Sequence, residues 1–319
     1  MANISVVDIS KIGLDAGDPS AEDLLSVGRD IVAAFRGSGF AYLQGHGVSQ
    51  QLQDKTFADA KGFFQLSEQE KLQYERFVKT GFNGYTPIGG ENNAYANEDG
   101  AYLIDYKECY DLHVKGEDYP SAVCPALGPQ LELFGSHCCR LTERLLAALD
   151  AALGSGQLLT SCHRRQLQPG GCSEMRVLYY PPVPDGLPEG TVRCGEHTDY
   201  GTFTLLFQDD IGGLELLTPD QKWEPAAPVP GTILVNIGDM MELWTAGQLR
   251  ATKHRVSVPA GERRRAAARQ SVVFFVVPDD KTIVAPLSGD PSYQPVDAGA
   301  FLRKQFAATY PKFSEMRVK

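Results

Sequence analysis

The chain has 319 residues, of which 43% are hydrophobic and 22% are charged, and its formal net charge is −10 at pH 7. This composition is typical of a globular protein with enough apolar mass for a core. The negative charge argues against a nucleic-acid partner, because phosphate binding needs clustered positive charge. The seven cysteines are scattered and form no CxxC pair, which indicates reduced thiols rather than a disulfide framework or a zinc knuckle.

The chain shows no targeting or membrane signal. Its first residues, MANISVVDIS, lack a basic segment followed by a long apolar run, so they do not resemble a signal peptide. No window approaches 18 uninterrupted apolar residues, so no membrane-spanning helix is expected. We expect a cytoplasmic protein that acts on a small molecule as a monomer or weak homo-oligomer, with no nucleic-acid or membrane partner.

Residues 1–120 are expected to form a mixed α/β region that packs on the core. Ser20 with Asp23 and Ser67 with Glu70 have the spacing of capping boxes, which begin helices. Between them, the stretch GFAYLQGHG alternates like a short strand. Residues 80–100 are dense in Gly, Asn and Pro and are expected to be a long loop, a kind of segment that is often functional.

Residues 121–155 contain the longest helical pattern. Seven apolar side chains recur there as one stripe, and Gly154 is placed to end the helix. The stripe consists of Leu127, Leu131, Phe134, Cys138, Leu141, Leu145 and Leu149. We expect a long helix that flanks the core.

Between residues 170 and 285 the apolar period changes to two. Short segments such as MRVLYY, TFTLLF, LELL, TILVNI and SVVFFVV are separated by Gly/Pro turns. This pattern predicts an antiparallel sandwich or barrel, for which the jelly roll is a natural candidate. Residues 286–319 are expected to form a helical C-terminal segment that acts as a lid, and all four regions are expected to form one structural unit.

The segment CGEHTDYGTF places His197 and Asp199 two residues apart. On a strand, residues i and i+2 point to the same side, so both side chains would suit one metal ion while Glu196 and Thr198 face away. Taken alone, the motif is explained equally well as a surface pair.

One further histidine completes a metal site. His254 lies in the same run of strands, 55 residues after Asp199. The remaining histidines have no partner motif and are interpreted as structural or solvated: His46, His113, His137 and His163. Two histidines and one carboxylate on a β scaffold form the facial triad of non-haem Fe(II) oxygenases, which leaves adjacent positions open for a co-substrate and O2. A zinc hydrolase is the competing interpretation of three such ligands.

Arg269 and Ser271 favour the iron interpretation. They lie two residues apart at the start of a very hydrophobic strand, and Arg269 follows His254 by 15 residues. A guanidinium forms a forked, charge-assisted pair with a carboxylate, and a neighbouring hydroxyl adds a third hydrogen bond. We expect this pair to hold the distal carboxylate of 2-oxoglutarate while its 2-oxo-acid end chelates iron.

Over most of its length the chain resembles the isopenicillin N synthase-like branch of the Fe(II)/2-oxoglutarate-dependent dioxygenases. The likeness extends through AFRGSGFAYLQGHGV, FFQLSEQEKLQY, YKECYDL, MRVLYYPP, HTDYGTFTLL, VNIGDMMELWTAG and RATKHRV. The combination of these segments is highly specific. The resemblance implies a mainly β fold with flanking helices, a distorted double-stranded β-helix (jelly roll) with the metal near one mouth.

The resemblance also implies roles for individual residues. His197, Asp199 and His254 match the iron ligands, and Arg269 with Ser271 matches the co-substrate clamp. Tyr180 matches a tyrosine that often hydrogen-bonds 2-oxoglutarate. Many members have an asparagine two residues earlier, where this chain has Leu178, so this part of the pocket is expected to be more apolar. Asn236, Gly238 and Asp239 match a family landmark that we interpret as turn chemistry holding the barrel.

The expected activity is that of an Fe(II)- and 2-oxoglutarate-dependent dioxygenase that uses O2 to oxidise a small metabolite. C–H abstraction would lead to hydroxylation, desaturation or oxidative ring closure. No catalytic residue beyond the metal site is identified. Arg193 has the strand parity of His197 and is a candidate substrate-binding residue. It would favour an amino-acid-like or carboxylated substrate, as in kainoid-type cyclisation.

Two alternatives stay open. An oxidase or cyclase like isopenicillin N synthase would use the same iron ligands without 2-oxoglutarate, with Arg269 and Ser271 holding a substrate carboxylate instead. A non-catalytic jelly-roll binding protein would keep the fold and lack the chemistry. Succinate release and Fe(II) binding distinguish these interpretations.

Overall fold

The structure is a computed structural model that describes residues 3–91, 105–184, 192–258 and 267–313. Its large sheet has eight strands in the order β1-β2-β10-β7-β12-β5-β4-β3. In that order they are Ser5–Asp8, Phe40–Gln44, Thr232–Ile237, Phe203–Gln208, Arg269–Val276, Glu174–Tyr180, Glu108–Leu112 and Gly84–Thr86. A smaller sheet, β6-β11-β8-β9, contains Cys194–His197, His254–Val256, Leu214–Leu217 and Trp223–Pro225.

The two sheets face each other as the two layers of a jelly roll. A cluster of buried apolar residues joins them, with Leu178 and Val273 contributed by the large sheet and Leu216 and Val256 by the small one. The observed architecture confirms the expected mainly β fold with flanking helices. Apart from these sheets, β13 (Ile283–Val284) pairs with β14 (Val296–Asp297) near the C-terminus.

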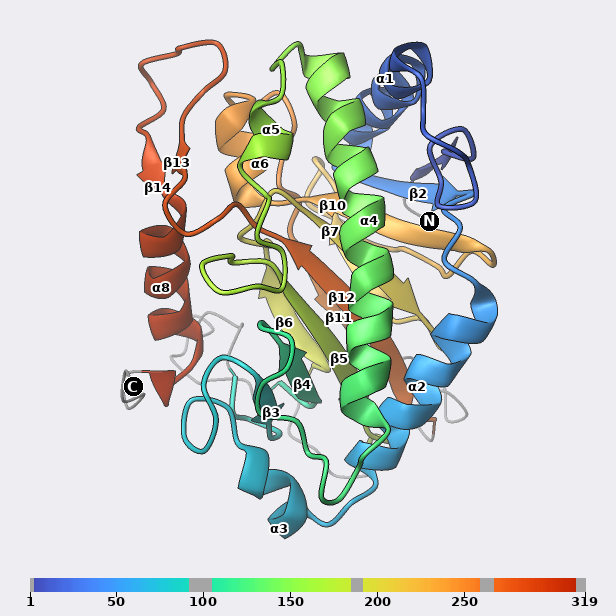
Figure 1. Ribbon diagram of the computed structural model, residues 1–319, viewed down its shortest axis with the longest axis vertical. Coiled ribbons are helices and arrows are strands. Elements are labelled where there is room, and N and C mark those ends of the chain that lie inside the picture. The colour runs from blue at the N-terminus through green and yellow to red at the C-terminus, as the bar shows by residue number, and fades with distance from the viewer. Residues whose placement is uncertain (1–2, 92–104, 185–191, 259–266, 314–319) are drawn as a thin grey trace.

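Helices cover the other face of the large sheet (Figure 1). They are α1 (Ala21–Ser38), α2 (Gln50–Phe64) and α4 (Leu127–Leu153), and the short α3 (Glu68–Lys71) and η1 (Leu72–Tyr74) follow α2. The ring of Phe134 on α4 packs edge-on against Phe207 of β7, with centroids 4.9 Å apart. Gly28 lets α1 approach α4 closely, because a Cβ there would lie 2.0 Å from the carbonyl oxygen of Ala148.

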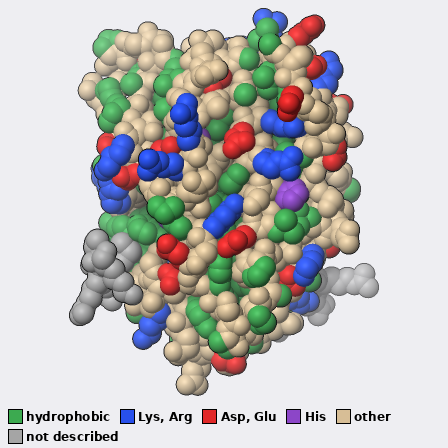
Figure 2. Space-filling view, in the orientation of Figure 1, with side chains coloured by type: hydrophobic (Ala, Val, Ile, Leu, Met, Phe, Trp, Pro, Cys, Tyr) green, Lys and Arg blue, Asp and Glu red, His purple; other side chains and the backbone are tan. Residues whose placement is uncertain are grey.

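Three further helices are described outside this layer. They are α5 (Leu158–Ser161), α6 (Asp239–Trp244) and α8 (Ala298–Thr309). No helix among the described residues is long and apolar enough to cross a membrane. Acidic and basic side chains are interspersed over the face seen in Figure 2.

Local sequence signals explain most of the element ends. The Ser20 hydroxyl accepts the Asp23 N–H at the start of α1, and Ser67 with Glu70 forms the predicted capping box of α3. The long helix ends at Gly154, whose φ of 68° is left-handed. One expectation was wrong: the segment 80–100 is not all loop, because Gly84–Thr86 pairs with β4. Residues 92–104 of that segment lie outside the described residues.

Strand alternation determines which side chains reach the space between the sheets. Along β5, Met175 and Val177 belong to the core under the helices, whereas Arg176, Leu178 and Tyr180 face the other way. On β12 the same alternation turns Arg269, Ser271, Val273 and Phe275 inward. The two neighbouring strands therefore build one continuous wall of the site.

Candidate functional site

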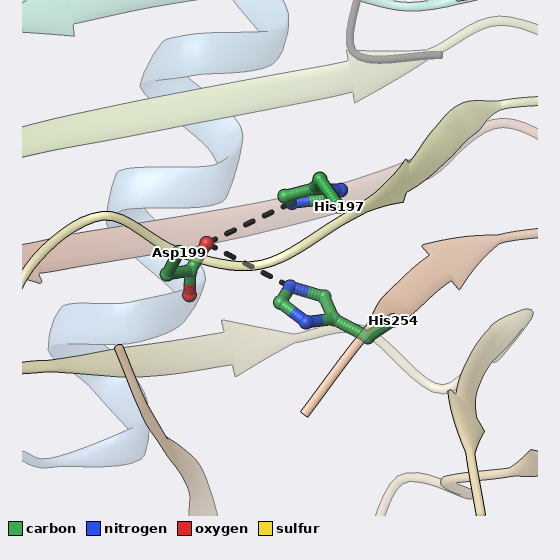
Figure 3. Close-up of side chains that lie close together, drawn as sticks. All are labelled: His197, Asp199 and His254. Atoms are coloured by element: carbon green, nitrogen blue, oxygen red, sulfur yellow. Dashed lines mark ion pairs between the residues drawn. The ribbon is translucent and has the colours of Figure 1, made fainter. Parts of the chain in front are cut away.

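His197, Asp199 and His254 converge between the two sheets (Figure 3). His197 ends β6 and His254 begins β11, and the two residues are register partners across that strand pair. The Nε2 atom of each imidazole lies 3.7 Å from Oδ1 of Asp199. One potential ligand atom from each residue lies within 4.8 Å of the other two. The three side chains could therefore hold one metal ion.

The premise of the expectation was wrong in one respect. His197 and Asp199 do not share a strand, because β6 ends at His197 and Asp199 lies in the segment that follows. Glu196 faces away as expected and pairs with Lys253 at the surface, at 3.2 Å. Thr198, which was also expected to face away, instead lines the cavity.

Backbone and side-chain hydrogen bonds orient the three candidate ligands. Nδ1 of His197 lies 2.8 Å from the carbonyl of Gly195, and Nδ1 of His254 lies 3.1 Å from that of Thr252. Since a carbonyl only accepts, each Nδ1 carries the proton and each Nε2 faces the centre. The Asn236 amide donates to Oδ2 of Asp199 at 2.7 Å, which leaves Oδ1 toward the imidazoles.

The electrostatics of the three side chains favour positive charge beside the Asp199 carboxylate. Burial opposes ionisation of Asp199, but the imidazoles of His254 and His197 and the Asn236 amide lower its pKa below the usual value. Burial lowers the pKa of His254 to about 4, and the charge of His197 adds to this effect. Against the effect of burial, Cys194 and Asp199 raise the pKa of His197 to about 10. The carboxylate thus stabilises positive charge on the neighbouring imidazoles, as it would stabilise a divalent cation at the same place.

Arg269 and Ser271 lie at one end of the cavity, which we call the co-substrate end. The Arg269 side chain is almost fully buried, its Nη2 donates to Gln208 at 3.0 Å, and its Nη1 lies 3.4 Å from the Ser271 hydroxyl. Its guanidinium lies over the ring of Tyr180, 4.8 Å from the centroid. Among the described residues, Nε of Arg269 has no hydrogen-bond partner. Asp209 lies close enough for the Arg269 charge to stabilise its carboxylate, although its Oδ atoms accept from backbone N–H groups instead. The site is therefore ready for an external anion.

Burial and the charge of Arg269 shift the pKa values of two residues near this end, Tyr180 and Arg193. Burial raises the pKa of Tyr180 to about 12, so its hydroxyl stays protonated and can donate. Leu178 lines the cavity with Leu206, so this wall is apolar as expected. Arg193 is fully buried and donates to the carbonyls of Pro181 and Ala267. Burial and the charge of Arg269 lower the pKa of Arg193.

The cavity has a volume of about 120 Å³ and continues past the metal-ligand cluster to a second, charged end. Four ionisable side chains line that end, and sequence reasoning missed all of them: Glu91, Lys107, Glu174 and Arg176. The available signal was the strand EMRVLYY, where Glu174 and Arg176 alternate into the same face as Leu178 and Tyr180. The C-terminal helix α8 contributes Leu302, Phe306 and Thr309 to the lining. The lid role of residues 286–319 stays a prediction, and residues 314–319 lie outside the described part.

The other histidines have structural contacts. His163 bridges the Leu159 carbonyl and the Thr202 hydroxyl, at 2.6 and 2.7 Å, and His46 accepts the N–H of Val48. Asn236, which we interpreted as turn chemistry, also donates a hydrogen bond to the candidate ligand Asp199. All seven cysteines are free, as expected.

Comparison with known proteins gives consistent matches over both halves of the chain. Residues 171–278 match the model of the 2OG-Fe(II) oxygenase superfamily, and residues 4–131 match the N-terminal model of non-haem dioxygenases in morphine synthesis. The chain is 32% identical over 304 residues to homoarginine-6-hydroxylase from Glycine max, a match that covers 90% of this chain and 88% of that protein.

Solved structures give the same result. A full-length Neurospora crassa protein, crystallised in complex with alpha-KG and thymine, has a TM-score of 0.81 at 26% identity, with 96% of each chain covered. A 2OG-Fe(II) oxygenase family protein from Caulobacter crescentus has a TM-score of 0.78 at 27% identity, covering 97% of this chain and 99% of that one.

Proposed function

Because the chain belongs to the 2OG-Fe(II) oxygenase superfamily, and is thus an Fe(II)- and 2-oxoglutarate-dependent dioxygenase, we propose that His197, Asp199 and His254 bind its iron. The observation that carries this proposal is the convergence of two imidazole Nε2 atoms on one carboxylate oxygen, at 3.7 Å each. Two histidines and a carboxylate are the donor set that suits Fe(II) with open positions for further ligands.

We propose that Arg269 and Ser271 hold the distal carboxylate of 2-oxoglutarate and that the Tyr180 hydroxyl contributes a further hydrogen bond. The unpartnered Nε of the buried Arg269 supports this role, because a buried cation is stable only beside an anion. Arg193, the candidate substrate-binding residue, is not among the described residues that line the cavity, and its guanidinium donates to backbone carbonyls. It adds positive charge beside Arg269, which favours an anionic occupant of this end without direct contact. Leu178 and Leu206 exclude water from this part of the cavity.

With iron, 2-oxoglutarate and O2 bound, the site supplies an oxidant strong enough to remove hydrogen from an unactivated carbon. The protein chain orients the substrate carbon and keeps water out. We propose hydroxylation of a small amino-acid-like or carboxylated metabolite, which the name of the homoarginine-hydroxylating relative and the ionisable cavity lining support. Desaturation and ring closure, including the kainoid type, are alternative outcomes of the same hydrogen abstraction.

The experiment is an anaerobic Fe(II) titration followed by measurement of succinate with and without candidate substrates. We expect one Fe(II) per chain and succinate formation that depends on both iron and 2-oxoglutarate. The matched variant Asp199→Ala is expected to bind no Fe(II) at the same concentrations. A wild-type chain that binds no Fe(II) would contradict the proposal.

A second candidate is an oxidase or cyclase that works without 2-oxoglutarate. The same Arg269 and Ser271 pair favours it, since the pair would hold a substrate carboxylate equally well. Product formation without succinate would establish this second candidate and exclude the first.

A further inference from the structure

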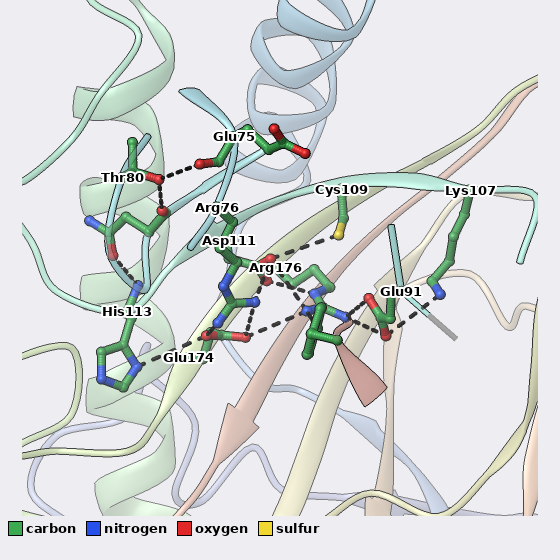
Figure 4. A network of polar contacts seen from close by, with 12 residues as sticks. Glu75, Arg76, Thr80, Glu91, Lys107, Cys109, Asp111, His113, Glu174 and Arg176 are labelled. Carbon is green, nitrogen blue, oxygen red and sulfur yellow. Dashed lines mark hydrogen bonds and ion pairs between the residues drawn. The ribbon is translucent and has the colours of Figure 1, made fainter. Parts of the chain in front are cut away.

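Away from Arg269, the cavity lining includes charged side chains, and these belong to the network of polar contacts that Figure 4 shows. We call this surface the charged wall and define it as Glu91, Lys107, Glu174 and Arg176. Arg176 precedes Tyr180 by four residues on β5, so about 13 Å of strand separates the charged wall from the co-substrate end. The candidate iron ligands line the same cavity, which leaves the charged wall facing the space for the primary substrate.

Arg176 is a fixed support rather than an open binding group. Its Nε donates to Oδ1 of Asp111 at 2.6 Å, and its Nη1 lies 3.1 and 2.9 Å from the two carboxylate oxygens of Glu91. Its Nη2 donates to the hydroxyl of Tyr310. The guanidinium is thus engaged on all sides, and it fixes the direction of the Glu91 carboxylate on the cavity lining.

Lys107 supplies a cation next to that carboxylate. Its Nζ lies 2.6 Å from Oδ2 of Asp105 and 3.6 Å from Oε1 of Glu91. An ammonium group carries three donors, so these contacts leave donor capacity toward the cavity that Lys107 lines. The charged wall therefore presents an ammonium and a carboxylate side by side.

The charges around the wall are nearly balanced. The cations are Arg76, Lys107 and Arg176, and the carboxyl groups are Glu91, Asp105, Asp111 and Glu174. Burial raises the pKa of Glu174 to about 8, which weakens the contribution of its negative charge, so the cations and the carboxylates of this region nearly cancel. A ligand with a net charge would disturb this balance in a region of low dielectric, where an unpaired ion is costly. A ligand that carries one charge of each sign preserves it.

We propose that the charged wall selects a zwitterionic substrate of the α-amino-acid type, whose carboxylate binds Lys107 and whose ammonium group binds Glu91. Its side chain then extends toward the iron ligands, past the rings of Tyr200 and Phe275 on the cavity lining. The oxidised carbon accordingly belongs to the side chain rather than to the α-carbon. The assignment rests on the proposed oxygenase function, because it is that reaction which consumes the substrate.

The first experiment compares compounds on the iron-loaded wild-type protein. L-Arginine, L-lysine, L-proline, L-leucine and L-phenylalanine are each tested for succinate release beside the methyl ester, which lacks the anion, and the deaminated acid, which lacks the cation. We expect stimulation by at least one amino acid and a kcat/KM for its ester and its deaminated acid that is lower by roughly tenfold or more, the effect of one charge-assisted hydrogen bond.

Other outcomes of this comparison overturn the assignment. Equal stimulation by an ester or a deaminated acid does so, and so does a panel in which no amino acid stimulates succinate although Fe(II) and 2-oxoglutarate bind. Failure to bind Fe(II) and 2-oxoglutarate at all, measured by calorimetry, contradicts the proposed oxygenase function instead. The two proposals therefore fail in different ways.

The second experiment uses matched lysine variants. Lys107→Met is expected to raise KM for the amino acid more than it lowers kcat, and to remove the preference over the ester. Lys71→Met is the control, because Lys71 is also buried and paired with a glutamate, Glu108 at 2.5 Å, but is not part of the cavity lining. This control is expected to keep the preference, and Lys107→Arg is expected to restore it in part.

Glu91→Gln tests the other half of the pair, because it removes the charge and keeps the shape. It is expected to reduce the preference for the amino acid over the deaminated acid, with the preference over the ester retained. If Lys107→Met and Glu91→Gln lower kcat/KM equally for all three compounds, the charged wall has only a structural role and the assignment is wrong.

Discussion

Each end of the cavity contains a buried arginine, and the two arginines differ in how many acceptors surround the guanidinium. Arg176 has acceptors from Asp111, Glu91 and Tyr310 around its guanidinium. Arg269 has only Gln208 and Ser271, and its Nε is unpartnered among the described residues. The two residues lie on neighbouring strands, β5 and β12, so the difference comes from their partners and not from the depth of burial.

This difference separates a structural charge from a binding charge. A buried cation costs several kcal/mol unless an anion compensates it. At the charged wall, carboxylates of the chain itself compensate Arg176. At the co-substrate end, no carboxylate of the described residues is hydrogen-bonded to Arg269, and Asp209 acts on it only through its charge. An incompletely compensated buried cation makes the folded chain less stable there than an apolar residue would. A local loss of folding stability of this kind is typical of a binding site.

Between the two ends lie the candidate iron ligands, and Asp199→Ala should disable both. We expect succinate formation to fall to the background level, because the remaining two imidazoles no longer match a three-ligand site. The measurement is succinate release at saturating 2-oxoglutarate, with circular dichroism as a control for folding. Retention of substantial iron-dependent turnover would show that Asp199 is not a ligand.

Arg176→Met and Arg269→Met break the comparison between the arginines most directly. Removing Arg176 leaves Asp111 with Arg76 and Glu91 with Lys107, so two buried carboxylates each lose one cation. This loss should lower the free energy of unfolding by about 3–5 kcal/mol. Removing Arg269 leaves no carboxylate without a partner, so without 2-oxoglutarate the free energy of unfolding should stay the same or rise. Urea unfolding of the two variants measures both effects. Similar losses in both variants would contradict this distinction between the arginines.

The sequence predicted which side chains of the metal-ligand cluster and of the Arg269 end lie close together, because these signals are local. His197 and Asp199 lie two residues apart in the sequence, as do Arg269 and Ser271. Residues this close in the sequence stay close in space even where the predicted strand bounds are wrong. The error at Asp199 illustrates this, since β6 ends before it and the side chain still reaches the centre. The long helix Leu127–Leu153 and its end at Gly154 were predicted for the same reason, from a stripe within one element.

The charged wall could not be predicted because its partners are distant in the chain. Arg76 pairs with Glu174 across 98 residues, and Arg176 pairs with Asp111 across 65. A charged residue within an apolar strand indicates that a partner exists, but it does not identify that partner. Asn236 has the same difficulty, since its contact with Asp199 depends on how β10 is placed beside the segment after β6.

A second variant series sharpens the role of the co-substrate end. Arg269→Met should raise KM for 2-oxoglutarate by roughly 10- to 100-fold, because each charge-assisted hydrogen bond contributes about 1.5–3 kcal/mol. Arg269→Lys should give an intermediate value, since it keeps the charge and loses the fork. Initial rates over a range of 2-oxoglutarate concentrations measure this. An unchanged KM in both variants would indicate that the distal carboxylate binds elsewhere.

Asn236→Ala tests whether a residue that contacts a candidate iron ligand, without being a ligand itself, affects Fe(II) binding. The amide donates to Oδ2 of Asp199, so its loss should free the carboxylate to rotate. We expect Fe(II) affinity to fall by roughly 10- to 100-fold, the usual effect of losing an outer partner of a metal ligand. Asn236→Asp is the informative companion, because it places a second carboxylate at the same position. If Asn236→Ala binds Fe(II) with wild-type affinity, Asn236 does not orient Asp199 and contributes only to the turn.

The smallest expected effect concerns His113, which lies beside the charged wall with its Nδ1 4.0 Å from Glu174. Burial and the charge of Arg76 lower its pKa to about 4, against about 6.5 in the unfolded chain. Between these values the unfolded chain binds a proton that the folded chain does not, so stability falls as pH decreases from about 6.5 toward 4. At pH 5 the loss from this histidine should be about 2 kcal/mol.

His113→Gln should remove that part of the pH dependence, as measured by urea unfolding at pH 7 and pH 5. His163, whose pKa burial also lowers to about 4, would keep its own part in this variant. If the variant retains the full slope, the folded protein binds a proton at His113 and this histidine does not destabilise the protein at low pH. His113 would then act as a fourth cation beside Glu174 and would belong to the same compensated network as Arg176.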